Sequence, residues 1–341
     1  MRVFGTLVAV AAASLIALAH SAGAHALEKN AISFATTGVP TFYGLPLVVA
    51  KQRGYFADEG LKVDINEFAG GSRAAQAVVG GSADVGMGGF EYALQLQPKG
   101  IALKNVVVTL RYPAIAIGVG KAYASRYRSP KDLKGLRIGV SAPGSQTHFG
   151  VSRLLAKAGL QSSDVSIIGL GPPPSALAAV RAGKVDALSY ADPVMTVLEA
   201  QGDLRIIADA RTTKGTTDLF GAAYPGGAVY VLEDFAKANP ATVQAVANAM
   251  VRALKWLHTA SAADLGRVVP VEYLQEDRAL YFVGFAKFRE AFSPDGLCTD
   301  AMAEAAKKVL VENDPKLAQA GLRSKDTFDN RFALAAQAKK P

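Results

Sequence analysis

Cysteine and histidine are scarce in this chain of 341 residues, which has four histidines and a single cysteine, Cys298. A single cysteine excludes an internal disulfide, so burial of apolar side chains must hold the fold together. We expect no metal site, because zinc sites use three or four thiol, imidazole or carboxylate ligands grouped together. The chain also lacks a Walker A motif, and residues 86–89 are only a fragment of a dinucleotide fingerprint, so we expect no cofactor.

Long hydrophobic runs are absent beyond the N-terminus, and the apolar stretch at 106–119 is interrupted by Arg111 and Pro113. The N-terminus itself has Arg2, an apolar run at 7–19 and an Ala-His-Ala pattern at 24–26. These features are typical of a secretory signal peptide. We therefore predict cleavage after Ala26 and export; a retained membrane anchor is the alternative, although the run is short for a span.

Charge is moderately basic, with 37 Lys and Arg against 29 Asp and Glu, a formal net charge of +8. The basic residues are dispersed and form no stripe, so we expect no nucleic-acid partner. A basic surface favours anionic small molecules, although such a surface also serves solubility alone.

The segment 132–160 predicts a strand at 136–140, a glycine turn and a helix at 146–158. Gly144 allows a tight turn, and Ser145 suits the N-cap of the helix. The first N–H groups of a helix have no partner inside it, so they can bind an anion. A plain strand-to-helix turn is the other interpretation.

An internal repeat aligns residues 72–86 with residues 174–188 at an offset of 102. The matched pairs are Ala74 with Ala176, Ala77 with Ala179, Val78 with Val180, Gly81 with Gly183 and Asp84 with Asp186. Each copy predicts a helix, a glycine turn and a strand, as in α/β folds with mostly parallel sheets. We predict two doubly wound lobes joined by two strands, with lobe 1 at 27–120 and 224–341 and lobe 2 at 121–223. A ligand would bind outside the carboxyl ends of the strands.

An enzyme is not favoured by the residues. His148 follows Ser145 by less than one helical turn, but the chain has no G-x-S-x-G elbow and no evident acid partner for a hydrolase.

Several motifs resemble the substrate-binding proteins of nitrate, sulfonate and taurine ABC transporters, which have the type II periplasmic binding protein fold. They are Pro46 to Ala50, Gly54-Tyr55-Phe56, Glu59 to Val63, Gly80 to Val85, Asp132 to Gly135, Ile138 to Val140, Gly144-Ser145, Gly159-Leu160 and Gly183 to Ala187. The resemblance covers residues 31–260. It implies a periplasmic, monomeric protein whose lobes close on a small solute and then dock on a membrane permease.

The resemblance also implies a site built from the loops at strand ends. The candidate ligand-binding residues are Thr41, Phe42, Tyr43, Ser72, Phe90, Arg111, Tyr112, Ser145, Gln146, Thr147, His148, Tyr190 and Asp192. Arg111 is equally compatible with a surface ion pair, and Asp192 with a helix cap. Tyr112 and Tyr224 flank the two crossings between lobes, where packing would explain them as well.

We expect the solute to be a small organic anion, either a sulfonate or a carboxylate with an apolar or aromatic part. This expectation rests on three capped helix N-termini, at Ser72, Ser145 and Ser175, and on the aromatic residues near the first two. The alternatives are a thiamine-type pyrimidine precursor as the solute, a sensor module, and an enzyme on the same fold.

Overall fold

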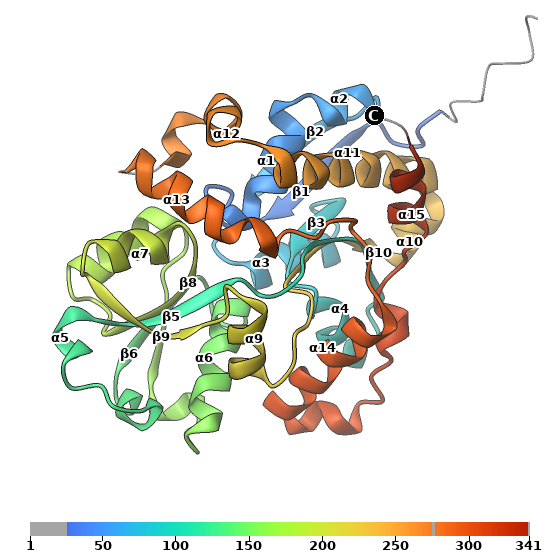
Figure 1. The fold of residues 1–341 in the computed structure, drawn as a ribbon. Coiled ribbons are helices and arrows are strands. Elements are labelled where there is room, and N and C mark those ends of the chain that lie inside the picture. Colours follow the sequence, from blue (N-terminus) through green and yellow to red (C-terminus); the bar gives the residue numbers. More distant parts are fainter. Residues whose placement is uncertain (1–25, 275–276, 340–341) are drawn as a thin grey trace, which may run out of the picture.

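The computed structural model describes residues 26–274 and 277–339, and its strands form two five-stranded sheets, each the centre of one lobe (Figure 1). The predicted signal peptide lies almost wholly outside the described residues. The first sheet has the order β2-β1-β3-β10-β4, with β1 at Ala31–Thr36, β2 at Lys62–Glu67, β3 at Val85–Gly88, β4 at Leu103–Leu110 and β10 at Gly227–Leu232. Strand β1 is parallel to β2 and β3, whereas β10 is antiparallel to β3 and β4.

The second sheet has the order β7-β6-β8-β5-β9. Its strands are β5 at Ile115–Gly120, β6 at Arg137–Val140, β7 at Ser166–Gly169, β8 at Ala187–Ala191 and β9 at Leu204–Asp209. Strand β6 is parallel to β7 and β8, and β5 is antiparallel to β8 and β9. The predicted α/β fold of two lobes is confirmed, and both sheets are mixed, because β10 and β5 are each antiparallel to their neighbours.

Two segments connect the lobes, residues 111–114 before β5 and the residues just before β10. They lie side by side, since the Gly226 N–H donates to Leu110 O at 3.0 Å. A methyl group on Gly226 would lie only 2.0 Å from Tyr112 O, so glycine is required there. Because β5 pairs with β8 and β9, the chain leaves the first lobe before β5 and not after residue 120.

The repeated aspartates occupy equivalent places in the two sheets. Asp84 accepts a hydrogen bond from the Ser33 N–H of β1 at 3.0 Å, and Asp186 accepts one from the Arg137 N–H of β6 at 2.9 Å. Each aspartate therefore ties the strand that it precedes to the neighbouring parallel strand. The internal repeat reflects the same construction in both lobes.

Helices and strands alternate through most of the chain up to β10, and only helices follow β10. Before the first crossing the helices are α1 Leu45–Gln52, α2 Tyr55–Asp58, α3 Gly71–Val79 and α4 Tyr92–Gln95. Between the crossings they are α5 Lys121–Ala124, α6 Gln146–Lys157, α7 Pro173–Arg181, α8 Val194–Ala200 and α9 Thr213–Phe220. After β10 they are α10 Glu233–Ala238, α11 Pro240–Thr259, α12 Ala262–Val268, α13 Arg278–Phe288, α14 Asp300–Asn313 and α15 Arg331–Ala338.

The C-terminal helices pack on both lobes. Helix α11 is rich in alanine and valine and buries Val246, Met250 and Leu254 in the core that also contains α1 and β1. Helix α14 instead shares a core with α6 and α9, and Glu312 pairs with Arg153 of α6 at 2.9 Å. The region after residue 224 thus also contributes to the packing of the second lobe.

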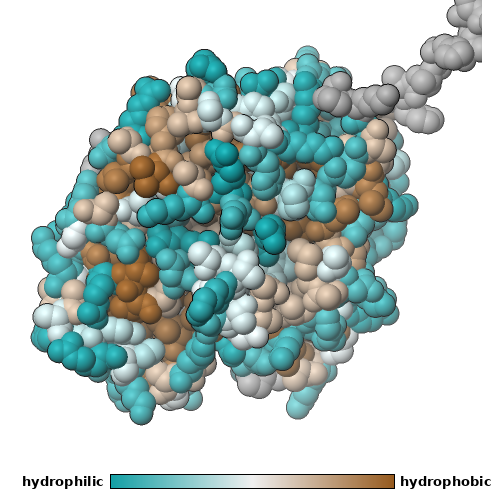
Figure 2. All heavy atoms as spheres, in the orientation of Figure 1, coloured by the Kyte–Doolittle hydropathy of each residue, from teal (hydrophilic) through white to brown (hydrophobic). Residues whose placement is uncertain are grey.

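The surface is mostly polar, and hydrophobic side chains on the face shown in Figure 2 form separate patches. Only three large hydrophobic side chains are exposed within the described ranges, Val271, Val283 and Leu334. None of the helices in those ranges has the length and apolar character needed to cross a bilayer.

Candidate functional site

A cavity lies between the two lobes, and fourteen residues from both of them line it. They are Thr37, Gly38, Thr41, Tyr43, Gly71, Gly88, Gly89, Tyr92, Ile115, Ser141, Ser145, Gln146, Thr147 and Tyr190. The unfilled space among the lining residues is about 480 Å³, including the part open to solvent. The wall contains no charged side chain, and most of its polar groups are hydroxyls.

The first lobe contributes the segments that follow β1 and β3 and the beginning of α3. The loop after β1 brings Thr41 and Tyr43 to the cavity, and the end of β3 brings Gly88 and Gly89. These are the carboxyl ends of parallel strands, where α/β sheets bind their ligands. A methyl group on Gly71, the first residue of α3, would lie 2.5 Å from the Tyr92 hydroxyl, so the wall is tight here.

The second lobe contributes a triangle of hydroxyl groups at the start of α6. The Oγ atoms of Ser141 and Ser145 are 2.9 Å apart, and the Thr147 Oγ1 lies 3.0 Å from the first and 2.8 Å from the second. Thr147 also accepts the Ser141 N–H at 3.0 Å. This triangle faces the cavity beside the first N–H groups of the helix.

Helix α6 begins after Ser145, as predicted, but the Ser145 side chain does not cap it. That side chain is engaged in the hydroxyl triangle. His148 instead accepts the Gly144 N–H at its Nδ1 at 2.9 Å, just before the helix. Burial lowers the pKa of His148, which favours the neutral ring that this acceptor role requires.

Ser72 and Ser175 do not cap their helices either. Helix α3 begins at Gly71 with Gly70 at its N-cap, so Ser72 is the second helical residue. Helix α7 begins at Pro173, with Pro172 at the N-cap, and Ser175 is the third residue. None of the three predicted serine caps is present; the starts of α6 and α3 contribute residues to the cavity wall, and the start of α7 does not.

The two lobes touch around the cavity through several hydrogen bonds. The Phe42 N–H donates to Asp192 O at 2.9 Å, and the Ser72 hydroxyl donates to Pro143 O at 3.0 Å. Across the same gap, a methyl group on Gly70 would lie 2.2 Å from the Ala142 Cβ. The lobes are therefore in a closed arrangement.

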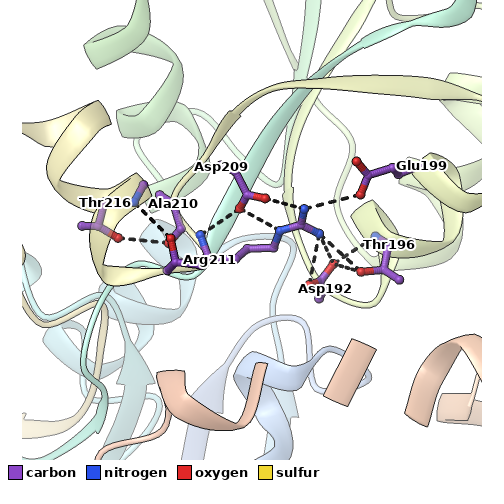
Figure 3. A network of polar contacts seen from close by, with 9 residues as sticks. Asp192, Thr196, Glu199, Asp209, Ala210, Arg211 and Thr216 are labelled. Atoms are coloured by element: carbon purple, nitrogen blue, oxygen red, sulfur yellow. Dashed lines mark hydrogen bonds and ion pairs between the residues drawn. The ribbon is translucent and has the colours of Figure 1, made fainter. Parts of the chain in front are cut away.

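Asp192 belongs to a charged network that holds the loop after β8 (Figure 3). Its carboxylate accepts hydrogen bonds from the Thr196 N–H at 3.0 Å and the Thr196 hydroxyl at 2.9 Å. The Arg211 guanidinium lies 3.2 Å from Asp192, 2.6 Å from Asp209 and 3.5 Å from Glu199. Desolvation opposes the charge of Arg211, but the surrounding carboxylates outweigh it and raise its pKa. Asp192 is thus neutralised within its own lobe.

Two carboxyl groups lie close to the cavity without lining it. Burial raises the pKa of Glu91 to about 7, against hydrogen bonds from its own backbone and from Gln146. Burial also raises the pKa of Glu67, against hydrogen bonds from the Val39 and Gly38 N–H groups. Both groups therefore lie behind a wall that is itself uncharged.

Six of the thirteen predicted ligand-binding residues line the cavity: Thr41, Tyr43, Ser145, Gln146, Thr147 and Tyr190. His148 lies behind the turn of α6, and the hydroxyl of Ser72 is bonded across the lobes. Asp192 is a partner of Arg211 and caps α8 through Thr196, as the alternative interpretation had it.

The other four residues lie in cores or at the crossing. Phe42 is fully buried and packs edge-on against Tyr281, with ring centroids 4.9 Å apart. Phe90 is fully buried in the core shared with α6 and α14. Tyr112 is buried at the crossing, and Arg111 is exposed, with its N–H bonded to Ala291 O. The predicted aromatic residues thus divide between two roles: Tyr43 and Tyr190 line the cavity, whereas Phe42, Phe90 and Tyr112 are packed in the interior.

Eight wall residues were not predicted: Thr37, Gly38, Gly71, Gly88, Gly89, Tyr92, Ile115 and Ser141. Thr37, Gly38 and Ser141 stand in strand-end loops, so the rule that selected Thr41 and Ser145 would have found them. The glycines follow the same rule, since a residue without a side chain lets a solute approach the backbone. Tyr92 and Ile115 carry no such signal.

No cluster of three or more His, Cys, Asp or Glu side chains suited to a metal ion occurs at 26–274 or 277–339.

The family model described as "NMT1/THI5 like" matches residues 41–261. This chain belongs to the NMT1/THI5-like family. A solved structure from Bordetella bronchiseptica RB50 is 44% identical to this NMT1/THI5-like chain and covers 92% of it and 98% of its own length, with a TM-score of 0.89. The alkanesulfonate-binding protein SsuA from Xanthomonas axonopodis pv. citri, bound to MOPS, is 25% identical, with a TM-score of 0.69 over 89% of this chain and 100% of that one.

Two kinds of named relatives share part of the NMT1/THI5-like chain. The "putative aliphatic sulfonates-binding protein" of Escherichia coli is 30% identical over 185 residues, 54% of each chain. The "4-amino-5-hydroxymethyl-2-methylpyrimidine phosphate synthase" of Schizosaccharomyces pombe is 29% identical over 145 residues, 42% of this chain and 41% of that one. The chain thus spans about half the length of these two relatives or less.

Proposed function

We propose that this NMT1/THI5-like protein is the periplasmic solute-binding component of an ABC importer and that it captures a small organic anion, a sulfonate or a carboxylate, between its lobes. The observation that carries this proposal is the start of α6, where three hydroxyl groups at the N-terminus of a helix line an interlobe cavity. The kinship with alkanesulfonate-binding proteins supports the same class of solute.

Uncharged donors are sufficient for such a solute. The N-terminus of a helix carries a partial positive charge, and its N–H groups point at whatever occupies the cavity. Hydrogen bonds to an ionised group are shorter and stronger than those between neutral groups. Tyr43, Tyr92 and Tyr190 can pack against the apolar part of the solute.

The importer role follows from the two-lobe arrangement. Closure of the lobes encloses the solute, and the closed form is the one that a membrane permease would read. No chemical step is proposed, because the cavity wall offers hydroxyl and amide groups without an imidazole, thiol or carboxylate among its fourteen residues. The exported protein would begin at Leu27 and act as a monomer.

The test is a thermal-shift screen of the chain from Leu27 with alkanesulfonates, aliphatic and aromatic carboxylates, and nitrate. A ligand at a hundred times its dissociation constant adds about 2.7 kcal/mol to stability, which raises the midpoint by a few degrees in a protein of this size.

Thr147→Val removes one corner of the hydroxyl triangle while keeping the shape of the side chain. We expect Thr147→Val to weaken binding of the best anion by about tenfold, the worth of one hydrogen bond to a charged group. The matched control is Thr259→Val, an exposed position in the last turn of α11. Equal affinities of the two variants in isothermal titration would contradict the site, and no shift with any anion would contradict the proposed function.

A pyrimidine precursor is a second candidate solute. Glu67 and Glu91 near the cavity suit a solute that donates hydrogen bonds, as an aminopyrimidine does, and some relatives are named as pyrimidine phosphate synthases. Adding 4-amino-5-hydroxymethyl-2-methylpyrimidine to the screen separates the two candidates. A shift with this pyrimidine and with no anion would favour the second.

A further inference from the structure

Glu91 is an ionisable group that the proposed capture of an organic anion leaves unused. It lies between β3 and α4, is 1% exposed, and its carboxyl group is folded back onto the cavity wall. A methyl group on Gly89, which lines the cavity, would lie 2.4 Å from Glu91 Oε1 and 2.7 Å from Oε2. The carboxyl group thus lies directly against the backbone of a wall residue.

The carboxyl group is poorly satisfied by hydrogen bonds. Its Oε2 accepts one long bond of 3.4 Å from Gln146 Nε2, and the same amide group donates a shorter bond of 2.6 Å to Gly226 O. Its Oε1 is buried and receives no hydrogen bond from another residue in the described part of the chain, so the carboxyl group has only its own backbone N–H and the Gln146 amide as donors there. Because a carboxylate can accept about four hydrogen bonds, this group retains unused capacity beside the cavity.

Among the described residues, no cation is one of the groups that shift the pKa of Glu91. The titratable groups that feel its charge are Tyr43 after β1, Tyr92 of α4, Tyr224 before β10 and Tyr230 of β10. Burial first, and the charge of Glu91 second, raise the pKa of each of these tyrosines, so all four stay neutral near pH 7. Helix α6 faces it with the uncharged amide of Gln146.

We propose that Glu91 selects solutes by charge: its carboxyl group admits a solute with one anionic group, disfavours a second anionic group, and favours an amino or hydroxyl group in its place. The inference rests on the proposed function, because it concerns the same cavity. Charges interact more strongly inside a protein than in water, so the charge of Glu91 can change the affinity for a solute in the cavity without direct contact. A negative charge at Glu91 repels a dianion most and attracts the ammonium group of a zwitterion.

The charge selection depends on pH. Burial places the pKa of Glu91 at about 7, so the group is mostly neutral at pH 6 and mostly ionised at pH 8. Rising pH therefore strengthens the discrimination against a second anionic group. Glu67 is the other carboxyl group near the cavity, and its own charge acts on Tyr190.

The experiment uses four sulfonates with the same two-carbon chain: ethanesulfonate, 2-aminoethanesulfonate, 2-hydroxyethanesulfonate and ethane-1,2-disulfonate. Affinities are measured by titration calorimetry at pH 6 and pH 8 for the wild-type chain, Glu91→Gln and the exposed control Glu272→Gln. We expect the wild type at pH 8 to bind 2-aminoethanesulfonate at least tenfold more tightly than ethane-1,2-disulfonate. We expect the ratio of these two affinities to be smaller at pH 6.

Glu91→Gln keeps the shape of the side chain and is expected to reduce the ratio severalfold and to remove its pH dependence, whereas Glu272→Gln leaves both unchanged. If the variant does not fold, the pH dependence of the wild type decides alone. The inference would be overturned if all four compounds bind and the ratio of the affinities for the amino compound and the disulfonate changes neither with pH nor in Glu91→Gln. The proposed function would then still stand. Failure of all four and of the other anions to bind overturns the proposed function, and the inference with it.

Discussion

Arg211→Met tests the charged network around Asp192 through the stability of the protein. The Arg211 side chain is 14% exposed and Asp192 is 4% exposed, so their ion pair is largely removed from water. Asp209 and Glu199 are 41% and 48% exposed and can be rehydrated when the guanidinium is lost. Asp192 is too deeply buried to be rehydrated, and its carboxylate would keep only the two hydrogen bonds from Thr196. Removing one partner of a buried pair costs about 3–5 kcal/mol.

We expect a loss near the lower end, about 3 kcal/mol, because the Thr196 bonds persist. At about 2 °C per kcal/mol in a protein of this size, the thermal midpoint should fall by about 6 °C. Urea unfolding followed by circular dichroism gives the free energy directly. Lys214→Met is the control, since Lys214 and Asp218 form an exposed pair worth less than about 1 kcal/mol. Adding Asp192→Asn to Arg211→Met should recover more than half of the loss. A loss no larger than that of Lys214→Met, or no recovery in the double variant, would refute the reasoning.

Two further substitutions test the lobe contact and the repeat. Gly70→Ala should weaken solute binding by tenfold or more, because the added methyl would lie 2.2 Å from Ala142 only when the lobes are closed. Gly54→Ala also has a positive φ but no neighbour within 4 Å, so it should cost stability alone, and calorimetry of both variants separates the two effects. Asp186→Asn should reduce stability most at neutral pH. The Arg137 hydrogen bond lowers the pKa of Asp186, so its contribution is fully present above the unfolded pKa of about 3.9 and is lost progressively as the pH falls from there through the lower pKa of the folded state. In urea unfolding, the difference in the free energy of unfolding between wild type and Asp186→Asn should be smaller at pH 3 than at pH 7. An equal difference at the two pH values would contradict this role.

The fold could be predicted from sequence because it depends on patterns that repeat along the chain. The match between Asp84 and Asp186 identified two units of the same construction, and both aspartates make the same strand contact. Alternating strands and helices then left few possible topologies. The helix start at Ser145 was also predictable, since a glycine turn precedes it.

The site was only partly predictable, because the identity of a residue does not say where its side chain points. Phe42 and Tyr43 are adjacent, yet the first packs against Tyr281 and the second lines the cavity. Ser145 carries a typical capping side chain, but two neighbouring hydroxyls compete for it. Glu91 follows a Gly-Gly-Phe sequence and looks like any acidic residue at the start of a helix. Only the packing of Gly89, Gln146 and the tyrosines reveals it as a buried group.

The position of β10 has a consequence for the order in which the protein can be assembled. Strand β4 joins the first sheet only through β10, which the chain supplies after the whole second sheet has been made. A nascent chain that ends before Gly227 therefore holds a complete second sheet but a first sheet with β4 still unattached. The lobe whose synthesis begins first is the one completed last, so no single cut in the chain can yield two halves that each fold as one lobe.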